Sequence, residues 1–578
     1  MRKLYFTLLL TICGMELYAQ YNFNVTTGAT VTIQSGGTVY WGGNLQIDGN
    51  LSGSGMFQLQ SPAQTVVGVG GINNLRVSNG AVVTPSNSIT ISNSLDVTAG
   101  SSLIIPASQY IVVNGPLTNA GTFNVNNNGS LVQAVGSTLT NSGTFNIQRE
   151  GTYQSLVFNY ISSPITTSSV PGAYRYAWNA NASTQSYGDD QDPDPGWLGP
   201  AYNLPMVPGI GMAVTGMGLA IFSGTANNGN ISAPMVYHPY SPGNTSPGTP
   251  FNLMGNPYPC AISASALISA NPDVNGSIYF WDDDLSNGFD YSNSDYAVWN
   301  GTGSLGTGSG AAGVPNGYIS TGQGFMIRSL NSGATLDFNN SMRMTGPNTQ
   351  FFRLDEEPSR IWLSLEGTDL FNQILIGMIE DATDGEDRLY DAVKIRGQQD
   401  IAIAAVNEES EYAIMAFPPS MEEKTIPLNI FVASSGTYKF HSNTIEGFEG
   451  YDLYLEDRND YSYYPLEEGT EVSFELAAGD HNERFYLHIG SQLVTDINDA
   501  DAPNIKAWIY DGFLTVIVEN INGKGQLELL DMSGKLVWAS SSQIISDRTT
   551  VDLSDLSKGV YIVKLVSESG VYSKKVIR

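Results

Sequence analysis

The side chains that could do chemistry in this sequence are mostly carboxylates that gather in loops. Hard oxygen ligands crowded together suit Ca²⁺, although none of the clusters has the EF-hand spacing. We therefore predict a weak calcium site, with solvated acidic loops as the alternative. The clusters are Asp189, Asp190, Asp192 and Asp194; Asp282, Asp283 and Asp284 with Asp290; and Asp381, Asp384, Glu386, Asp387 and Asp391. The candidate ligands are Asp282, Asp283, Asp284, Asp381, Asp384 and Glu386.

Recognisable catalytic patterns are missing from the sequence. The four histidines, at positions 238, 441, 481 and 488, form no H-x-x-x-H or H-E-x-x-H pattern, and His488 fits a structural role in a strand. No G-x-S-x-G or G-x-x-x-x-G-K-[ST] sequence occurs. Paired carboxylates are plentiful, so residue counts leave a glycosidase or polysaccharide lyase open. We predict a non-catalytic protein without a cofactor other than calcium; a carbohydrate-binding or carbohydrate-degrading protein is the alternative.

Aromatic side chains form a second group that could bind a partner. Tyr and Trp are frequent between positions 174 and 299, and their flat rings stack on sugars or anchor proteins. Core packing is the alternative for most of them. Trp197, flanked by Pro195-Gly196 and Gly199-Pro200, is predicted to be exposed. An extracellular glycan or protein is therefore a candidate partner.

Charge is scarce and unevenly placed along the chain. The 578 residues include 55 acidic and 25 basic side chains, a net charge of −30, which excludes nucleic acid as a partner. From Tyr21 to Asn146 the only charged residues are Asp48, Arg76 and Asp96. Residues 356–500, by contrast, hold 30 acids and 8 bases. These shifts divide the chain into regions of different chemistry.

An internal repeat organises the uncharged region, residues 20–148. Leu117-Thr-Asn-Ala-Gly-Thr-Phe123 recurs 22 residues later as Leu139-Thr-Asn-Ser-Gly-Thr-Phe145, and Leu95 lies one such step earlier. Leu51 to Phe57 has the same pattern three periods before Leu117. Apolar strand positions separated by Gly and Asn corners predict a β-solenoid. A β-sandwich with many Asn-x-Gly turns is the alternative.

The rest of the chain is also predicted to be β, without a long amphipathic helix. We expect a Gly- and aromatic-rich β module at 149–348, an acidic antiparallel sandwich at 349–495, and a separate Ig-like β-sandwich at 501–578. In the middle module we expect a strand at Met212–Ile221, a helical turn at Ser263–Ser269 and a flexible loop at Gly301–Gly310.

The first nineteen residues have the features of a secretory signal peptide. Arg2 and Lys3 precede a short apolar run, and Ala19 followed by Gln20 offers a cleavage site. This run is too short for a bilayer, and no later stretch reaches ~18 apolar residues, so we expect no transmembrane segment. Removal of the signal leaves Cys260 as the single cysteine, which excludes an internal disulfide.

Three motifs near the end of the sequence carry a resemblance. They are Leu529-Leu-Asp531-Met-Ser-Gly534-Lys-Leu-Val537, Leu553-Ser-Asp-Leu-Ser-Lys-Gly559-Val-Tyr561-Ile-Val-Lys-Leu565, and Lys574-Lys575-Val-Ile-Arg578. Together they resemble the type A sorting domain of the type IX secretion system of Bacteroidetes. The resemblance implies that Asp531, Gly534, Gly559, Tyr561, Lys574 and Lys575 belong to a sorting signal read by that machinery. It also implies passage through the periplasm to the cell exterior, with attachment to surface lipopolysaccharide or release.

The middle of the chain resembles a module of large flavobacterial adhesin-like surface proteins. The shared motifs include Asn252-Leu-Met-Gly-Asn-Pro-Tyr-Pro259, Gly276-Ser-Ile-Tyr-Phe-Trp281 and Gly322-Gln-Gly-Phe325. That resemblance implies no defined catalytic site. We therefore predict an exported cell-surface or secreted protein that serves adhesion, surface structure or matrix contact.

Overall fold

The computed structural model places strands in most of the chain. It describes residues 23–60, 64–151, 157–166, 174–181, 196–199, 205–239, 249–282, 295–307, 313–345, 359–395, 400–408, 410–419, 424–460, 462–491, 504–510, 513–519, 525–531, 534–540, 548–553, 556–557, 559–567 and 570–577. Strands account for 58% of the structure and helices for 3%, which confirms the all-β prediction. The predicted signal peptide and its cleavage site at Ala19 and Gln20 lie outside the described residues.

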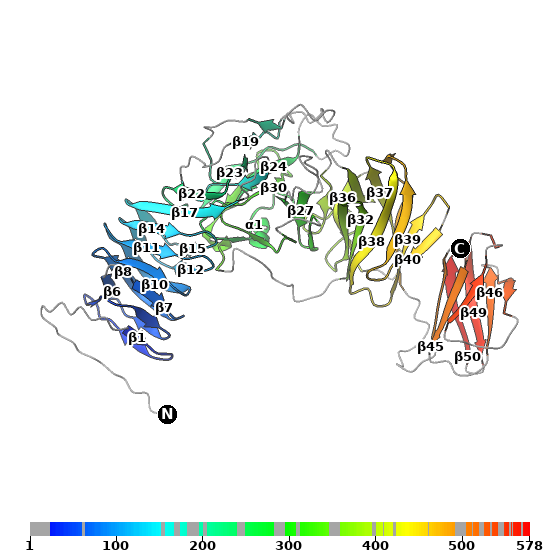
Figure 1. Cartoon of the computed structure of the whole chain (residues 1–578), viewed down its shortest axis with the longest axis horizontal. Helices are drawn as coiled ribbons and strands as arrows, with labels where there is room; N and C mark the ends of the chain where they lie inside the picture. The colour runs from blue at the N-terminus through cyan, green and yellow to red at the C-terminus, as the bar shows by residue number, and fades with distance from the viewer. Residues whose placement is uncertain are drawn as a thin grey trace, which may run out of the picture.

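A parallel β-solenoid of about six turns forms the N-terminal part, at the blue end of Figure 1. Its strands belong to two parallel sheets, so the predicted solenoid is confirmed and the sandwich alternative is wrong. The first sheet contains β1 (Phe23–Val25), β4 (Leu45–Ile47), β7 (Gln64–Val67), β9 (Val82–Pro85), β11 (Ser102–Ile105), β14 (Thr122–Val125) and β17 (Thr144–Glu150). The second contains β2 (Thr30–Thr32), β3 (Thr38–Trp41), β5 (Asn50–Ser52), β6 (Met56–Gln60), β8 (Gly71–Ser78), β10 (Ile89–Val97), β12 (Tyr110–Val113), β13 (Leu117–Asn119), β15 (Ser130–Gln133) and β16 (Leu139–Asn141).

Identical side chains stack from turn to turn along the solenoid. Phe123 and Phe145 are partners in register, and their rings stack 4.6 Å apart. Asn119 Nδ2 donates a hydrogen bond of 2.8 Å to Asn141 Oδ1 one turn later. Corner residues such as Asn79 and Gly100 have positive φ values of 52° and 78°, as Asn and Gly tolerate. Apolar columns and amide ladders therefore hold the turns together.

The predicted repeat is correct for the later turns and wrong in phase for the earliest one. Leu95, Leu117 and Leu139 form one column, as the 22-residue period requires. Below Leu95 the column continues through Leu75 and Phe57, because the turns shorten. Leu51 instead pairs with Ile72, so it belongs to another column than Leu117.

The middle module closes the far end of the solenoid. Strand β22 (Leu219–Ser223) runs antiparallel to β17 and ends the first solenoid sheet. The module's other strands form small sheets: β18 (Phe158–Ile161), β19 (Tyr174–Trp178), β20 (Trp197–Leu198) and β21 (Met212–Thr215); β23 (Ile231–Pro234) and β31 (Thr335–Phe338); β24 (Phe251–Gly255), β26 (Ile278–Trp281), β27 (Tyr296–Trp299), β28 (Ser304–Leu305) and β30 (Gly324–Arg328); β25 (Ile262–Ser263) and β29 (Tyr318–Ile319).

One local prediction for this module is wrong, one is tested only in part and one is confirmed. The single strand expected at Met212–Ile221 is two strands, β21 and β22, in different sheets, because Gly216 and Gly218 adopt positive φ between them. The expected flexible loop Gly301–Gly310 contains the short strand β28, which pairs with β27 and buries Leu305, and its residues 308–310 lie outside the described residues. The expected helical turn is α1 (Ala264–Ala270), capped by the Ser263 hydroxyl. A 3₁₀ turn, η2 (Asn340–Met342), follows β31.

The acidic region forms one large sheet that folds over on itself, coloured yellow-green to yellow in Figure 1. Its pairing is antiparallel except between β33 and β36. Phe440 and Phe474 from one side pack on Phe485 from the other, which gives the region a sandwich core. The strands are β32 (Ser359–Gly367), β33 (Leu370–Met378), β34 (Ala392–Val393), β35 (Ile401–Asn407), β36 (Ser410–Phe417), β37 (Lys424–Val432), β38 (Gly436–Glu446), β39 (Tyr451–Asp457), β40 (Ser462–Pro465), β41 (Glu471–Leu476), β42 (Gly479–Asp480) and β43 (Phe485–Ser491).

The C-terminal region is a small two-sheet sandwich, coloured orange to red in Figure 1. One sheet contains β44 (Asn504–Tyr510), β45 (Phe513–Glu519) and β48 (Arg548–Asp552). The other contains β46 (Gly525–Asp531), β47 (Leu536–Ala539), β49 (Val560–Ser567) and β50 (Gly570–Ile577). Leu514 and Val516 from the first sheet share a core with Leu529, Val563 and Leu565 from the second.

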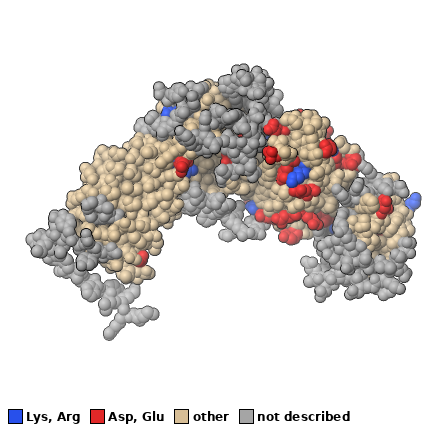
Figure 2. Space-filling view, in the orientation of Figure 1, with Lys and Arg blue, Asp and Glu red and all other residues tan. Residues whose placement is uncertain are grey.

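Figure 2 shows how charge is distributed over this fold. The described solenoid surface carries almost no red or blue, whereas red carboxylates crowd the acidic sandwich. Arg76 and Asp96 in neighbouring solenoid turns pair with each other at 2.7 Å. Among the residues that the structure describes, no helix is long and apolar enough to cross a bilayer.

Candidate functional site

Asp531 and Gly534 of the C-terminal sandwich are joined by a turn hydrogen bond. The Gly534 N–H donates to the Asp531 carbonyl at 2.9 Å, and Gly534 has a φ of 80°. The Asp531 carboxylate also accepts a hydrogen bond of 3.0 Å from the Lys535 N–H. A residue with a Cβ would be strained at this φ, so the glycine is required for the turn.

Side chains of the strand that follows Gly559 alternate between buried and partly exposed. Tyr561, Val563 and Leu565 are buried on one face of β49, and the Tyr561 hydroxyl donates to the Ser557 carbonyl at 2.6 Å. The two lysines of the basic end differ in their surroundings. Lys574 Nζ lies 3.2 Å from Asp452 of the acidic sandwich, whereas Lys575 is exposed and available to a receptor.

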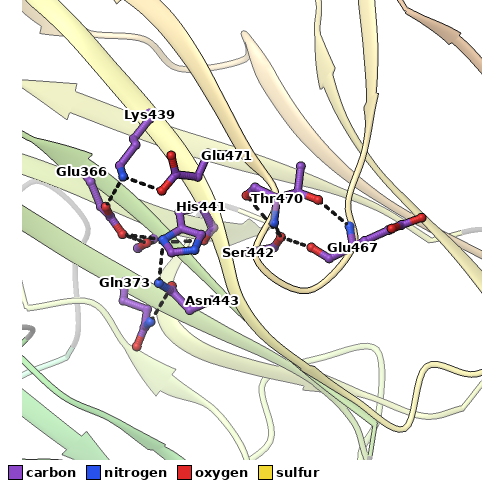
Figure 3. Close-up of polar contacts among 10 residues, drawn as sticks. Glu366, Gln373, Lys439, His441, Ser442, Asn443, Glu467, Thr470 and Glu471 are labelled. Atoms are coloured by element: carbon purple, nitrogen blue, oxygen red, sulfur yellow. Dashed lines mark hydrogen bonds and ion pairs between the residues drawn. The ribbon is translucent and has the colours of Figure 1, made fainter.

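A polar cluster on the acidic sandwich was not predicted from the sequence. Figure 3 shows Glu366 of β32 beside Lys439 and His441 of β38, with Glu471 of β41 on the other side of the lysine. Lys439 Nζ lies 3.0 Å from Glu366 and 2.6 Å from Glu471. His441 Nδ1 lies 2.9 Å from Glu366 Oε1. One ligand atom from each of Glu366, His441 and Glu471 lies within 4.8 Å of the others, a spacing that would suit a metal ion.

The lysine already supplies the positive charge that a metal ion would bring to this cluster. Burial alone would raise the pKa of Glu366, but hydrogen bonds from Ser364, His441 and Lys439 outweigh it and lower the pKa to about 2. A general acid of a glycosidase needs the opposite shift, towards neutral pH. The arrangement is therefore that of a cross-strand ion-pair network.

Sequence patterns could have revealed half of this cluster. Lys439 and His441 are two residues apart in an alternating strand, so they must share a face. Glu366 and Glu471 come from distant strands, and only the register of β32, β38 and β41 brings them there. His488, expected to be structural, lies 2.8 Å from the buried Glu456.

The carboxylates of the loop between β33 and β34 do not converge on one point. Asp384 pairs with Lys424, and Glu386 pairs with Arg328. Asp391 is buried, and its two oxygens accept hydrogen bonds from the backbone N–H groups of Asp387 at 2.6 Å and Ala416 at 2.8 Å. Asp384, Glu386 and Asp391 thus each have a protein donor, so protein contacts alone can fix the loop.

The other predicted calcium cluster is described only at its first residue. The Asp282 carboxylate accepts a hydrogen bond of 3.1 Å from the Thr307 hydroxyl. Asp283, Asp284 and Asp290, and the cluster from Asp189 to Asp194, lie outside the described residues. Calcium binding at Asp282, Asp283 and Asp284, and at Asp381, Asp384 and Glu386, stays a prediction.

The aromatic residues of the middle module pack against one another, and the exposed position predicted for Trp197 is wrong. Trp197 is half-buried, with its ring 4.8 Å from Trp178 and 5.7 Å from Tyr160. Tyr160 in turn stacks on Trp281 at 5.6 Å and shares a hydrogen bond of 2.8 Å with the Tyr296 hydroxyl. The Gly and Pro residues beside Trp197 predicted an exposed loop. Trp197 instead lies in β20, which pairs with β19.

A small cavity lies where the middle module meets the acidic sandwich. Tyr279, Tyr296 and Leu305 line one side, and Asn372 and Lys394 line the other. Its volume is about 20 Å³, enough for one water molecule rather than for a sugar. The Lys394 ammonium donates a hydrogen bond of 2.6 Å to Asn372 Oδ1 there.

Comparison with known proteins identifies the C-terminal region of the chain. The family model described as "Secretion system C-terminal sorting domain" matches residues 511–578. This match confirms the predicted sorting domain, so the protein is exported by the type IX secretion system to the cell surface or the medium. None of the curated proteins matches the chain.

Solved structures resemble this chain only weakly. A central fibronectin-III array of RIM-binding protein has 11% identity and covers 39% of this chain and 99% of its own, with a TM-score of 0.11. β-Glucuronidase 3 of Bacteroides uniformis has 10% identity, coverage of 24% of this chain and 26% of its own, and a TM-score of 0.10. A β-D-glucuronidase of Dictyoglomus thermophilum has 9% identity, coverage of 39% and 44%, and a TM-score of 0.10. Scores this low indicate neither a shared fold nor a shared activity.

The largest match covers most of the solenoid, the middle module and the acidic sandwich together. The family model described as "Domain of unknown function (DUF8693)" spans residues 71–489, more than half of the chain. It therefore runs across the domain boundaries that we predicted near residues 148 and 348, which remain predictions. The chain belongs to this DUF8693 family and carries a secretion system C-terminal sorting domain behind it.

Proposed function

We propose that the exported protein is a non-catalytic contact protein of the cell surface or extracellular matrix, and that its solenoid makes the contact. The observation that carries this proposal is the nearly uncharged outer surface of a solenoid stacked into about six turns. Such a surface presents rows of Asn, Ser and Thr side chains, which hydrogen-bond to polymers without attracting or repelling ions.

The chemistry of the described charged residues also supports a non-catalytic role. Arg76 and Asp96, two of the three charged residues on the predicted coil, are paired with each other. Glu366 has its pKa moved away from the range of a general acid, and Asp384 and Glu386 are ion-paired. These charged groups are engaged in contacts within the protein. We therefore propose that the surface binds a partner rather than catalyses a reaction.

A gene deletion tests this proposal directly. We expect cells without the protein to adhere less to their substratum or matrix, and the mature chain added back to coat the same material. In parallel, the purified mature chain is incubated with extracellular polysaccharides of the cells that produce it. Unchanged adhesion would contradict the proposal, and release of reducing ends would favour the carbohydrate-degrading alternative.

A further inference from the structure

The two ends of the solenoid differ in how their core is covered. At the far end, Phe145 is 1% exposed and Ile147 is fully buried, because β22 and the middle module pack on the last turn. Polar bonds reinforce this closure: Leu131 N–H donates to the Pro259 carbonyl at 2.8 Å, and Asn340 Nδ2 donates to the Ala134 carbonyl at 2.9 Å. This end is capped.

At the near end, four apolar columns stop at a half-buried side chain, although Val25 and Ile33 of the same turn are buried. Phe23, Val31, Val39 and Trp41 are only partly buried, whereas their partners one turn later are at most 2% exposed. Those partners are Leu45, Leu51, Phe57 and Leu59. The first turn therefore leaves the solenoid core open at this end in the described residues.

The strands of this first turn are also sheet edges. Within the described residues, β1 pairs only with β4, β2 only with β5, and β3 only with β6. Natural proteins protect such edges with charged side chains or proline. From Phe23 to Ile47 the sequence contains neither, and Tyr40 in β3 is 61% exposed. This edge is built like an interface rather than like a solvent-facing strand.

We propose that the open solenoid end binds the same end of a second copy of this chain, forming a closed head-to-head dimer. The charge distribution favours this partner. A chain with a net charge of −30 repels its copy, but 30 of its acids belong to residues 356–500, and the described ones among them lie on the acidic sandwich, beyond the middle module as seen from the first turn. Two copies that meet through their first turns keep these acidic sandwiches apart.

The symmetry of the contact limits the assembly to two chains. Both copies use the same surface, so the interface is isologous, with β1, β2 or β3 of one copy antiparallel to the matching strand of the other. At the far end of each solenoid β22 occupies the edge of the first sheet, and the middle module bonds to the last turn of the second sheet, so a third copy meets no free edge of the first sheet there. We therefore expect a dimer and no filament.

The test is the mass of the mature chain, starting at Gln20, measured by light scattering during size-exclusion chromatography over a concentration series. We expect twice the chain mass at micromolar concentration, and a dissociation constant that does not rise with salt because the interface is uncharged. Val39→Lys places an ammonium in the open end and should weaken the dimer at least about tenfold, since an unpaired buried charge is expensive.

A matched control separates this effect from general damage to the solenoid. Val69→Lys introduces the same charge on the same coil, at a side chain that is 80% exposed away from the first turn, and should leave the dimer intact. Hydrogen exchange in β11 and β14 should be equal in both variants, which shows that the coil is folded. A monomeric wild-type chain, equal weakening by Val69→Lys, or masses beyond two chains would overturn the proposal.

Discussion

The solenoid and the acidic sandwich are both made of β-strands, but different chemistry stabilises each. Solenoid turns are joined by stacked apolar columns and by amide ladders such as Asn119 to Asn141, and the Arg76–Asp96 ion pair adds little charge to the coil. The sandwich places ion pairs on its faces and even in its interior, where the buried Asp457 accepts two hydrogen bonds from Arg484 at 3.0 and 2.7 Å. Solenoid stability should therefore be indifferent to pH and salt, and sandwich stability should not.

The largest expected effect comes from opening an apolar column. Phe123→Ala removes a fully buried ring that stacks on Phe145, and should cost about 3–5 kcal/mol in the solenoid. Hydrogen exchange of β11, β14 and β17 should accelerate equally at pH 5 and pH 8. Thr118→Ala, at an exposed position of the same coil, is the control and should change little. A strongly pH-dependent loss would break the contrast between the two regions.

The second effect concerns the buried Asp391 of the sandwich. Burial raises the pKa of Asp391 to about 7, although backbone N–H donors from Asp387 and Ala416 work against it. Because the folded state holds this proton more tightly than the unfolded state, the contribution to stability is largest below pH 4 and falls as the pH rises towards 7.

Asp391→Asn removes this titration. Between pH 4 and pH 8 the wild type should therefore lose stability that the variant keeps. The difference amounts to about 1.4 kcal/mol for every unit by which the pKa of Asp391 in the folded wild type exceeds its value in the unfolded chain. Thermal unfolding at a series of pH values, followed by exchange in β34 and β36, measures the difference. Parallel curves for the two proteins would show that Asp391 does not titrate in this range.

The smallest effect is expected in the cluster of Figure 3. Glu366 has its pKa lowered to about 2 by Ser364, His441 and Lys439, so its contribution is present above pH 4.5 and is lost as the pH falls towards 2. Glu366→Gln should cost about 1 kcal/mol at pH 7, since the pair is partly solvated, and should cost almost nothing at pH 2. Glu449→Gln, an exposed acid of the same sandwich, serves as the control. Equal losses at both pH values would contradict the ion-pair account.

The regular parts of the fold could be predicted because they depend on local pattern. The 22-residue spacing of Leu95, Leu117 and Leu139 equals the number of residues in one turn of this part of the solenoid. Leu51 was misplaced because turn length varies, and an approximate motif does not report such variation. The motif that contains Gly559 and Tyr561 could be recognised for the same reason, since its residues are close together in the sequence.

The polar cluster and the position of Trp197 depend on contacts between distant segments. Glu366 and Glu471 lie more than one hundred residues apart, and nothing near either position indicates Lys439 as their shared partner. Trp197 has a loop-like sequence around it, yet its ring contacts Trp178 and Tyr160. Both the polar cluster and the position of Trp197 depend on strand register and on packing between distant segments. Neither can be inferred from the residues next to each position.

Adhesion of surface-displayed variants tests the central claim that the uncharged solenoid makes the contact. Thr118→Glu and Thr140→Glu add charge to an exposed row of the solenoid, whereas Glu449→Lys changes charge on the sandwich. At equal amounts on the cell surface, we predict that the two solenoid variants reduce adhesion several-fold and the sandwich variant does not, with wild-type adhesion unaffected by added salt. The reverse result, adhesion lost with Glu449→Lys or in high salt and retained with the solenoid variants, would contradict the claim.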